Sequence, residues 1–190
     1  ISQLVDTAGK LSQNRRGALI IVDLGSDLRP EDFLYSGTNI EAQLSTDLLI
    51  NLFATDTPLH DGAVLVKGNK IISAGVILPL SRQGISRYGT RHLAALGITE
   101  RFDRCICIVV SEETGTLSLA NQGKLERPIT SSRLQELLVN LIGNQNSIAT
   151  SKSSLNKTTL SKNIGQSDNI TNKINDKGSD KSENFSKIKD

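Results

Sequence analysis

Two short segments of the chain carry residue types that could perform chemistry on a phosphate group. Leu59-His60-Asp61-Gly62-Ala63 is a tight turn with a carboxylate, placed immediately before an apolar run. Gly89-Thr90-Arg91-His92 opens an expected helix, with an arginine and a histidine in its first turn. A carboxylate and an anion-binding helix end are what a metal-assisted reaction on a phosphate requires.

Asp61 is expected to bind a divalent metal or to accept a proton from a hydroxyl. Gly62 lets the backbone turn sharply and lets a substrate come close. The alternative is an Asp-Gly turn before a strand, which is what a bare Asp-Gly pair most often is. His60 likewise is either a metal ligand or a hydrogen-bonded side chain.

The second segment predicts an anion site at a helix N-terminus. We expect Thr90 to cap the helix and to leave free N–H groups in its first turn, while Gly89 keeps the approach open. Arg91 adds a bidentate phosphate partner and His92 a second donor. Cations are unfavourable at a helix N-terminus, so this basic turn favours function over an ordinary capped helix.

A third segment, Ser111-Glu112-Glu113, follows an apolar strand at its carboxyl end. Open α/β sheets place their ligand sites there, and one glutamate could complete a metal site with Asp61. The alternative is a solvated acidic turn. The cysteines of that strand, Cys105 and Cys107, have no other Cys or His near them in sequence, so we expect buried thiols and no metal.

Composition divides the chain at residue 144. Residues 144–190 are rich in Asn, Ser, Lys, Asp and Thr, without periodic apolar residues, so we expect a disordered tail after a folded domain over residues 1–143. The tail holds 8 lysines and 5 acidic residues, and the folded part holds 14 basic and 15 acidic residues. The folded part therefore lacks the positive charge that nucleic-acid binding requires.

The order of expected elements predicts an α/β fold whose mixed sheet is flanked by helices on both faces. Hairpins are expected around residues 67–70 and 122–123. We expect strands at residues 18–22, 34–44, 63–66, 71–78, 105–110, 116–120 and 125–128, and helices at residues 2–14, 47–54 and 90–101, with a last helix capped by Thr130 or Ser131.

Taken together, these motifs resemble the diadenylate cyclase (DAC) domain, specifically the membrane-type cyclases that make cyclic di-AMP. The resemblance covers residues 1–143 and depends on several ordered motifs. They are Leu48-Leu49-Ile50-Asn51 followed by Thr57-Pro58-Leu59-His60-Asp61-Gly62-Ala63, Leu78-Pro79-Leu80-Ser81, Gly89-Thr90-Arg91-His92 with Ala94-Ala95 and Gly97-Ile98-Thr99-Glu100, and Val110-Ser111-Glu112-Glu113-Thr114-Gly115.

The resemblance implies a reaction in which two ATP molecules form cyclic di-AMP and two pyrophosphates. It places Asp61 by the ribose 3′-hydroxyl and the metal, the Thr-Arg-His segment at the triphosphate, and Ser111 and Glu113 at the phosphates and metal. The expected catalytic residues are Asp61, Arg91 and His92, the nucleotide-binding residues are Gly62, Ala63, Gly89, Thr90, Ser111 and Glu112, and the ligands of Mg²⁺ or Mn²⁺ are Asp61, Glu113 and His60.

The product is two-fold symmetric, so we expect a second copy of the chain to complete a face-to-face catalytic dimer. Leu93 stands where the family's usual Arg-His-Arg motif has its second arginine. This leaves open a module that binds ATP or cyclic di-AMP without cyclising; a tail that recruits a partner is a third alternative.

The chain contains no methionine and no apolar run that could span a bilayer. Members of this family type carry transmembrane helices before the domain. We therefore expect a membrane tether upstream of Ile1 and a location on the cytoplasmic side of a membrane, with the plastid stroma as the alternative.

Overall fold

The computed structural model describes residues 1–83 and 87–143, and the predicted tail lies outside these ranges. The helices are α1 (Ser2–Gln13), α2 (Thr46–Leu52) and α3 (Thr90–Arg101), with a short 3₁₀ helix η1 (Pro30–Asp32) and a helical segment over residues 131–143. The strands are β1 (Ala18–Asp23), β2 (Thr38–Gln43), β3 (Ala63–Lys67), β4 (Lys70–Val76), β5 (Cys105–Val110), β6 (Leu117–Asn121) and β7 (Lys124–Ile129).

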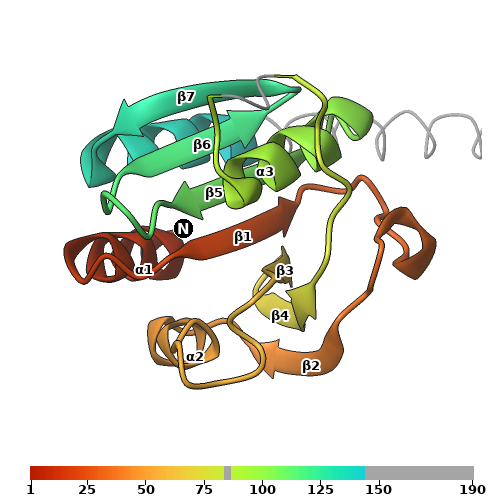
Figure 1. The fold of residues 1–190 in the computed structure, drawn as a ribbon, viewed down its shortest axis with the longest axis horizontal. Helices are drawn as coiled ribbons and strands as arrows, with labels where there is room; N and C mark the ends of the chain where they lie inside the picture. The colour runs from red at the N-terminus through yellow and green to blue at the C-terminus, as the bar shows by residue number, and fades with distance from the viewer. Residues whose placement is uncertain (84–86, 144–190) are drawn as a thin grey trace, which may run out of the picture. The chain divides into compact units, whose positions relative to one another are not determined.

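These seven strands form one mixed sheet in the order β2-β4-β3-β1-β5-β6-β7 (Figure 1). The two central strands, β1 and β5, are buried along their whole length, as their continuously apolar sequences predict. β1 pairs in parallel with β3 and antiparallel with β5. Hairpins join β3 to β4 and β6 to β7, as predicted.

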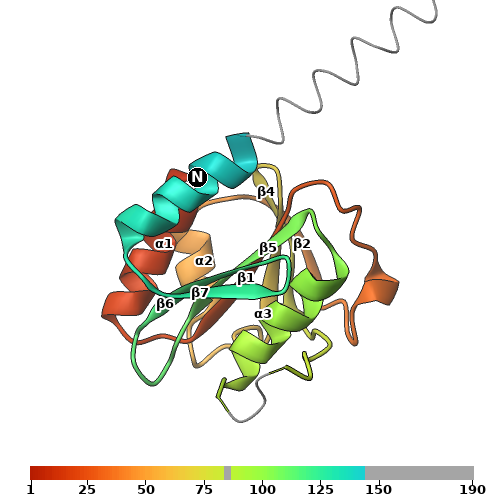
Figure 2. The ribbon, with the colours of Figure 1, turned by 90° about the horizontal axis from the view of Figure 1, so that it is seen from above.

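Helices cover both faces of the sheet, and the predicted fold class is confirmed (Figure 2). On one face, Leu11 of α1, Leu49 of α2 and Leu138 of the last helical segment share a core with alternate residues of β1 and β5. On the other face, Ala95 and Ile98 of α3 pack on the remaining residues of these strands. Both cysteines are buried, unbridged thiols on the α3 face.

Local capping explains where two of the helices begin. The Ser45 hydroxyl accepts the N–H of Leu48 at 3.2 Å, at the start of α2. The Thr130 hydroxyl accepts the N–H of Arg133 at 3.1 Å, before the last helical segment. Both caps satisfy N–H groups that the helix itself leaves without an acceptor.

Strand register brings the predicted functional segments to one end of the sheet. Ala18 at the start of β1 pairs with Val110 at the end of β5, and the parallel partner β3 starts at this end too. Asp61, just before β3, and Ser111, just after β5, therefore lie at the same end of the sheet. Only β1 lies between these two strands, so they are about 10 Å apart.

No helix in the two described ranges has both the length and the apolar character needed to cross a bilayer.

Candidate active site

A cavity of about 550 Å³ lies at this end of the sheet, where α3 begins and β5 ends. Its volume is in the range of sites for small molecules. It brings together two of the three predicted segments, the one that begins α3 and the one that follows β5. In the sequence, α3 and β5 lie between them. The lining residues are Arg87, Gly89, Thr90, Arg91, His92, Val110, Ser111, Glu112, Glu113, Thr114 and Arg127.

The helix at this cavity is capped by Gly89, and the prediction that Thr90 is the cap was wrong. Gly89 has an extended backbone (φ −73°, ψ 167°), and its carbonyl already accepts the N–H of Leu93 at 3.1 Å. Thr90 is consequently the first helical residue. The predicted consequence for anion binding is unchanged, because the N–H groups of Thr90 and Arg91 have no acceptor within the helix.

Arg91 is held by two neighbours from other segments. Its Nη1 donates to Glu112 Oε2 at 3.0 Å, which forms an ion pair across the cavity wall. The same guanidinium lies against Gly17, where an added Cβ would lie 2.6 Å from Nη1. Gly17 immediately precedes β1, so Arg91 reaches the start of the strand that lies between β3 and β5.

His92 is 6% exposed, and its Nε2 lies 3.2 Å from the Ser118 hydroxyl on β6. Burial lowers the pKa of His92 below its ordinary value of 6.5, and the nearby positive charge of Arg127 lowers it further. The imidazole is therefore neutral at pH 7. It can offer the cavity one hydrogen bond, but no positive charge.

The segment after β5 forms a tight turn that exposes both glutamates. The carbonyl of Ser111 accepts the N–H of Gly115 at 2.8 Å, which closes the turn. Glu112 and Glu113 are exposed at the tip of this turn and line the cavity. Carboxylate oxygens are thus available beside the N-terminus of α3.

The Asp61 turn lies outside this cavity, at the neighbouring position along the sheet end. Asp61 itself is exposed. His60 Nδ1 lies 2.5 Å from the carbonyl of Thr57, which leaves only Nε2 for another ligand. An added Cβ at Gly62 would lie 2.6 Å from the backbone carbon of Gly75, so this glycine lets β4 pack closely. Ala63 is buried and starts β3.

The residues expected to bind metal come from two segments, His60 and Asp61 from the turn before β3 and Glu113 from the turn after β5. Within the described ranges, no three His, Cys, Asp or Glu side chains lie close enough together to hold one ion. Mg²⁺ commonly takes one or two carboxylates and completes its shell with water and phosphate oxygens. Exposed carboxylates such as Asp61 and Glu113 fit that kind of site, with the nucleotide as a further ligand.

The sequence did not identify two residues that shape this region, Gly17 and Arg127. Arg127 reaches the cavity from β7, and its guanidinium carbon lies 5.6 Å from the centre of the Tyr88 ring. In the sequence, Arg127 is one charged residue in an expected hairpin and Gly17 is a helix stop. Neither sequence context indicates a functional residue, because the roles of Arg127 and Gly17 depend on contacts with α3 and the loop before it.

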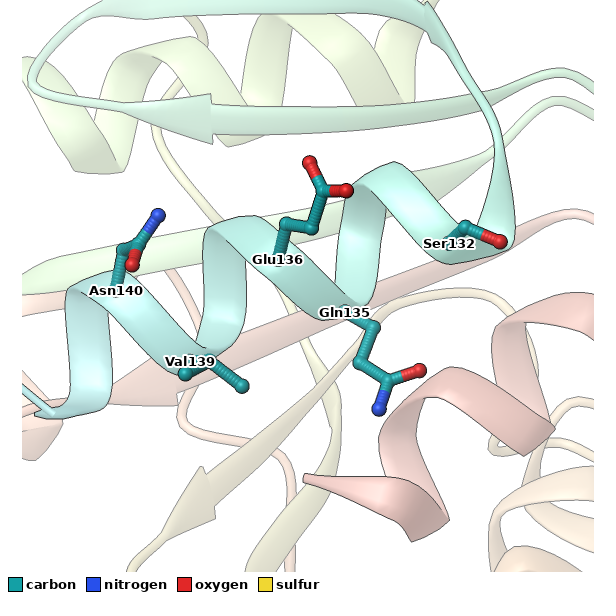
Figure 3. A pocket seen from close by; sticks show the side chains of 5 residues that line it. All are labelled: Ser132, Gln135, Glu136, Val139 and Asn140. Carbon is teal, nitrogen blue, oxygen red and sulfur yellow. The ribbon is translucent and has the colours of Figure 1, made fainter.

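A second hollow, of about 490 Å³, lies over the last helical segment (Figure 3). The side chains shown there all come from one helix and diverge from one another, so they present no converging polar groups. None of the predicted site residues lies there. The residues that line this hollow are Ser132, Gln135, Glu136, Val139 and Asn140.

Comparison with known proteins agrees with the resemblance seen in the sequence. The family model described as DisA bacterial checkpoint controller nucleotide-binding (DAC) matches residues 5–125. The diadenylate cyclase of Listeria monocytogenes serotype 1/2a (strain 10403S) is 47% identical over 131 residues, which cover 68% of this chain and 47% of that protein. Cyclic di-AMP synthase CdaA of Bacillus subtilis (strain 168) is 41% identical over 140 residues, covering 73% of this chain and 50% of the relative. The chain thus spans about half the length of these relatives.

Two solved structures share the fold. A double cysteine mutant of DacA from Staphylococcus aureus is 36% identical with a TM-score of 0.68, covering 74% of this chain and 93% of that one. A hypothetical membrane spanning protein from Bacillus cereus is 41% identical with a TM-score of 0.62, covering 68% of this chain and 63% of that one. With a family match over most of the folded part and this agreement in structure, the chain belongs to the DAC family.

Proposed function

We propose that this chain is a diadenylate cyclase, which converts two ATP molecules into cyclic di-AMP and two pyrophosphates. The observation that carries the proposal is the cavity that joins the start of α3 to the turn after β5. Thr90, Arg91, Ser111 and Glu113 all line it, and this supports a site that combines anion donors with carboxylate oxygens. The relatives named above as diadenylate cyclases support the same reaction.

In the proposed reaction, each 3′-hydroxyl oxygen forms a bond to the α-phosphorus of the other nucleotide. The bond from that phosphorus to the pyrophosphate oxygen breaks, and the hydroxyl proton leaves to a base. Such a transfer depends on in-line positioning and on charge stabilisation, with little covalent chemistry for the protein. The residues of the cavity are suited to that task.

The first turn of α3 is proposed to bind the phosphates. The N–H groups of Thr90 and Arg91 and the positive end of the helix dipole favour a phosphate oxygen. The Arg91 guanidinium is fixed by Glu112 at 3.0 Å and keeps further N–H groups for the nucleotide. Ser111, which also lines the cavity, adds a hydroxyl.

Asp61 is proposed to act at the ribose hydroxyl, as proton acceptor or metal ligand. It is exposed at the same end of the sheet as the cavity and is separated from β5 by β1 alone. A nucleotide that extends from the cavity across the start of β1 would reach Asp61. When bound, Mg²⁺ or Mn²⁺ supplies charge to the phosphates and acidifies the attacking hydroxyl, and Asp61 and Glu113 are the carboxylates proposed to hold it.

We also propose that two copies of the chain act face to face. Each ATP must be both nucleophile and electrophile, and the product has two-fold symmetry, so two identical half-sites related by a dyad suffice. Asp61 and the cavity lie together at one end of the sheet, which is the arrangement that a facing copy could cover.

The alternative function, a module that binds a nucleotide without cyclising it, depends on Leu93 standing in place of an arginine. Leu93 is 7% exposed and is absent from the described residues that line the cavity. The cavity still has three arginines in its lining, Arg87, Arg91 and Arg127, although position 93 carries a leucine. Cyclisation remains the function that the site supports best.

The experiment that tests this function is a product assay with radiolabelled ATP. The purified chain is incubated with ATP and either Mg²⁺ or Mn²⁺, and the products are separated by chromatography. We expect cyclic di-AMP and pyrophosphate in a ratio of about one to two, as the stoichiometry of the reaction requires. Binding of ATP without product, with either metal and at high protein concentration, would support the non-cyclising alternative.

We also propose that this domain lies close to a membrane. One structural relative carries the name hypothetical membrane spanning protein, which supports a tether outside the residues described above. We propose that the domain works on the cytoplasmic side of that membrane. Fractionation of cells that produce the natural protein would test it.

A further inference from the structure

Three arginines and two glutamates line the cavity, and one of these arginines is already in an ion pair with a glutamate. The lining set contains Arg87, Arg91 and Arg127 together with Glu112 and Glu113. Arg91 is already paired with Glu112 at 3.0 Å. Because His92 is neutral, the histidine of the segment adds no charge. The first turn of α3 therefore supplies less positive charge than its sequence indicates.

Arg127 differs from Arg91 in how it is held. Its guanidinium carbon lies 5.6 Å from the centre of the Tyr88 ring, on the loop that leads into α3. Within residues 1–83 and 87–143, no carboxylate forms an ion pair with Arg127. A guanidinium positioned by an aromatic face keeps its five N–H donors for hydrogen bonds to another partner.

The position of Arg127 follows from the packing of β7 and α3. β6 directs the Ser118 hydroxyl towards His92 of α3, and β7 is the next strand of the sheet. The register between β6 and β7 is irregular between Leu117 and Leu119, beside the position of Arg127. The charge of Arg127 is also close enough to lower the pKa of His92. Arg127 thus lies beside the start of α3.

We propose that Arg127 binds the phosphate chain of the nucleotide, together with Thr90 and Arg91, which line the same cavity. Its planar guanidinium can donate two parallel hydrogen bonds to phosphoryl oxygens. The proposal deepens the function given above and rests on it, since that function supplies a nucleotide as the ligand. Arg127 is a binding residue in this assignment, and no proton transfer is assigned to it.

The test compares two probes on matched variants by calorimetry. α,β-Methylene-ATP carries three phosphates but releases no pyrophosphate, and adenosine carries no phosphate. Arg127→Gln is expected to weaken the binding of α,β-methylene-ATP about tenfold or more, as loss of a charged hydrogen-bond donor does, and to leave adenosine within about twofold. Arg127→Lys keeps the charge and is expected to restore part of the affinity.

Arg101→Gln is the matched control. Arg101 also lies over an aromatic ring, 5.5 Å from the centre of Phe102, but at the far end of α3. This variant loses the same charge and a similar ring contact, and it should bind both probes as the unmodified chain does.

Two results would overturn the assignment of Arg127 without affecting the proposed function. One is an unchanged affinity of Arg127→Gln for α,β-methylene-ATP. The other is an equal loss for adenosine, which would mean that Arg127 only maintains the shape of the site. If the unmodified chain binds neither probe, the proposed function fails first, and the assignment of Arg127 fails with it.

Discussion

Gly17 leaves space for the guanidinium of Arg91. A Cβ added at Gly17 would lie 2.6 Å from Arg91 Nη1 and 3.1 Å from Glu112 Cβ. Gly17 is buried at the entry to β1, and its backbone is outside the left-handed region. The glycine is therefore required by the close approach of Arg91 and not by the backbone conformation.

Gly17→Ala is expected to impair nucleotide binding with little effect on stability. The main clash is with the end of a flexible side chain, so Arg91 can move away without disturbing the sheet. The displaced guanidinium loses its geometry at the phosphates, and we expect the KM for ATP to rise about tenfold. The melting temperature should remain within a few degrees, because a tolerated Gly→Ala change alters stability by about 1 kcal/mol or less.

Gly9→Ala is the control for this change. Gly9 lies in α1, and a Cβ there would meet only the Ser131 hydroxyl at 3.4 Å, an ordinary contact. Its KM should not change. A KM for Gly17→Ala equal to that of the unmodified chain would mean that the position of Arg91 does not limit ATP binding.

Much of the fold was predictable, because its elements follow local patterns. The continuously apolar runs of β1 and β5 predicted strands buried on both faces, and both are fully buried. The glycine-containing turns predicted both hairpins. The start of the last helix was predicted with Thr130 or Ser131 as its cap, and Thr130 is the residue that accepts the N–H of Arg133.

The wall of the cavity was only partly predictable, because it depends on contacts between distant segments. The start of α3 and the end of β5 were identified from short motifs, and the structure brings both to the cavity. Arg127 was missed because nothing local to β7 indicates that it faces Tyr88. The cap was placed one residue late because glycine and threonine are both accepted at that position.

Asp61→Asn is expected to abolish formation of cyclic di-AMP while ATP binding largely persists. The change removes the negative charge and the basicity of the side chain but keeps its size. Asp61 is exposed and lies outside the cavity, so the fold and phosphate binding should be preserved. Product formation is measured with labelled ATP, and binding by calorimetry with α,β-methylene-ATP. Normal cyclisation by this variant would show that Asp61 has no role in the reaction.

His92 should make the folded state less stable at acidic pH. Its pKa is lowered in the folded state from an ordinary value of 6.5. Below pH 6.5 the unfolded chain therefore takes up a proton that the folded chain resists, and the free energy of unfolding falls as pH decreases. Urea denaturation between pH 7.5 and 5 would measure this slope, and His92→Gln should remove part of it. An identical slope in the variant would show that His92 titrates normally.

Gly97→Ala is expected to destabilise the contact that fixes α3 over the sheet. A Cβ at Gly97 would lie 2.8 Å from the backbone nitrogen of Ser81, whose N–H donates to the Leu93 carbonyl at 2.9 Å. The gain in helix propensity from alanine is about 1 kcal/mol, and the clash with backbone atoms is expected to exceed it by about 1–3 kcal/mol. Urea denaturation gives the difference. A variant as stable as the unmodified chain would mean that the 79–81 segment yields without cost.

Cyclase activity per subunit should rise with protein concentration, because each product needs two half-sites. At concentrations below the dissociation constant of the dimer, the rate is expected to scale with the square of subunit concentration. Initial rates across a dilution series at saturating ATP, with sedimentation at the same concentrations, would measure this. ATP binding per subunit should stay constant on dilution, since the residues proposed to hold the phosphates all belong to the cavity of a single copy. A constant rate per subunit in a range where sedimentation finds only monomers would show that one copy completes the reaction alone.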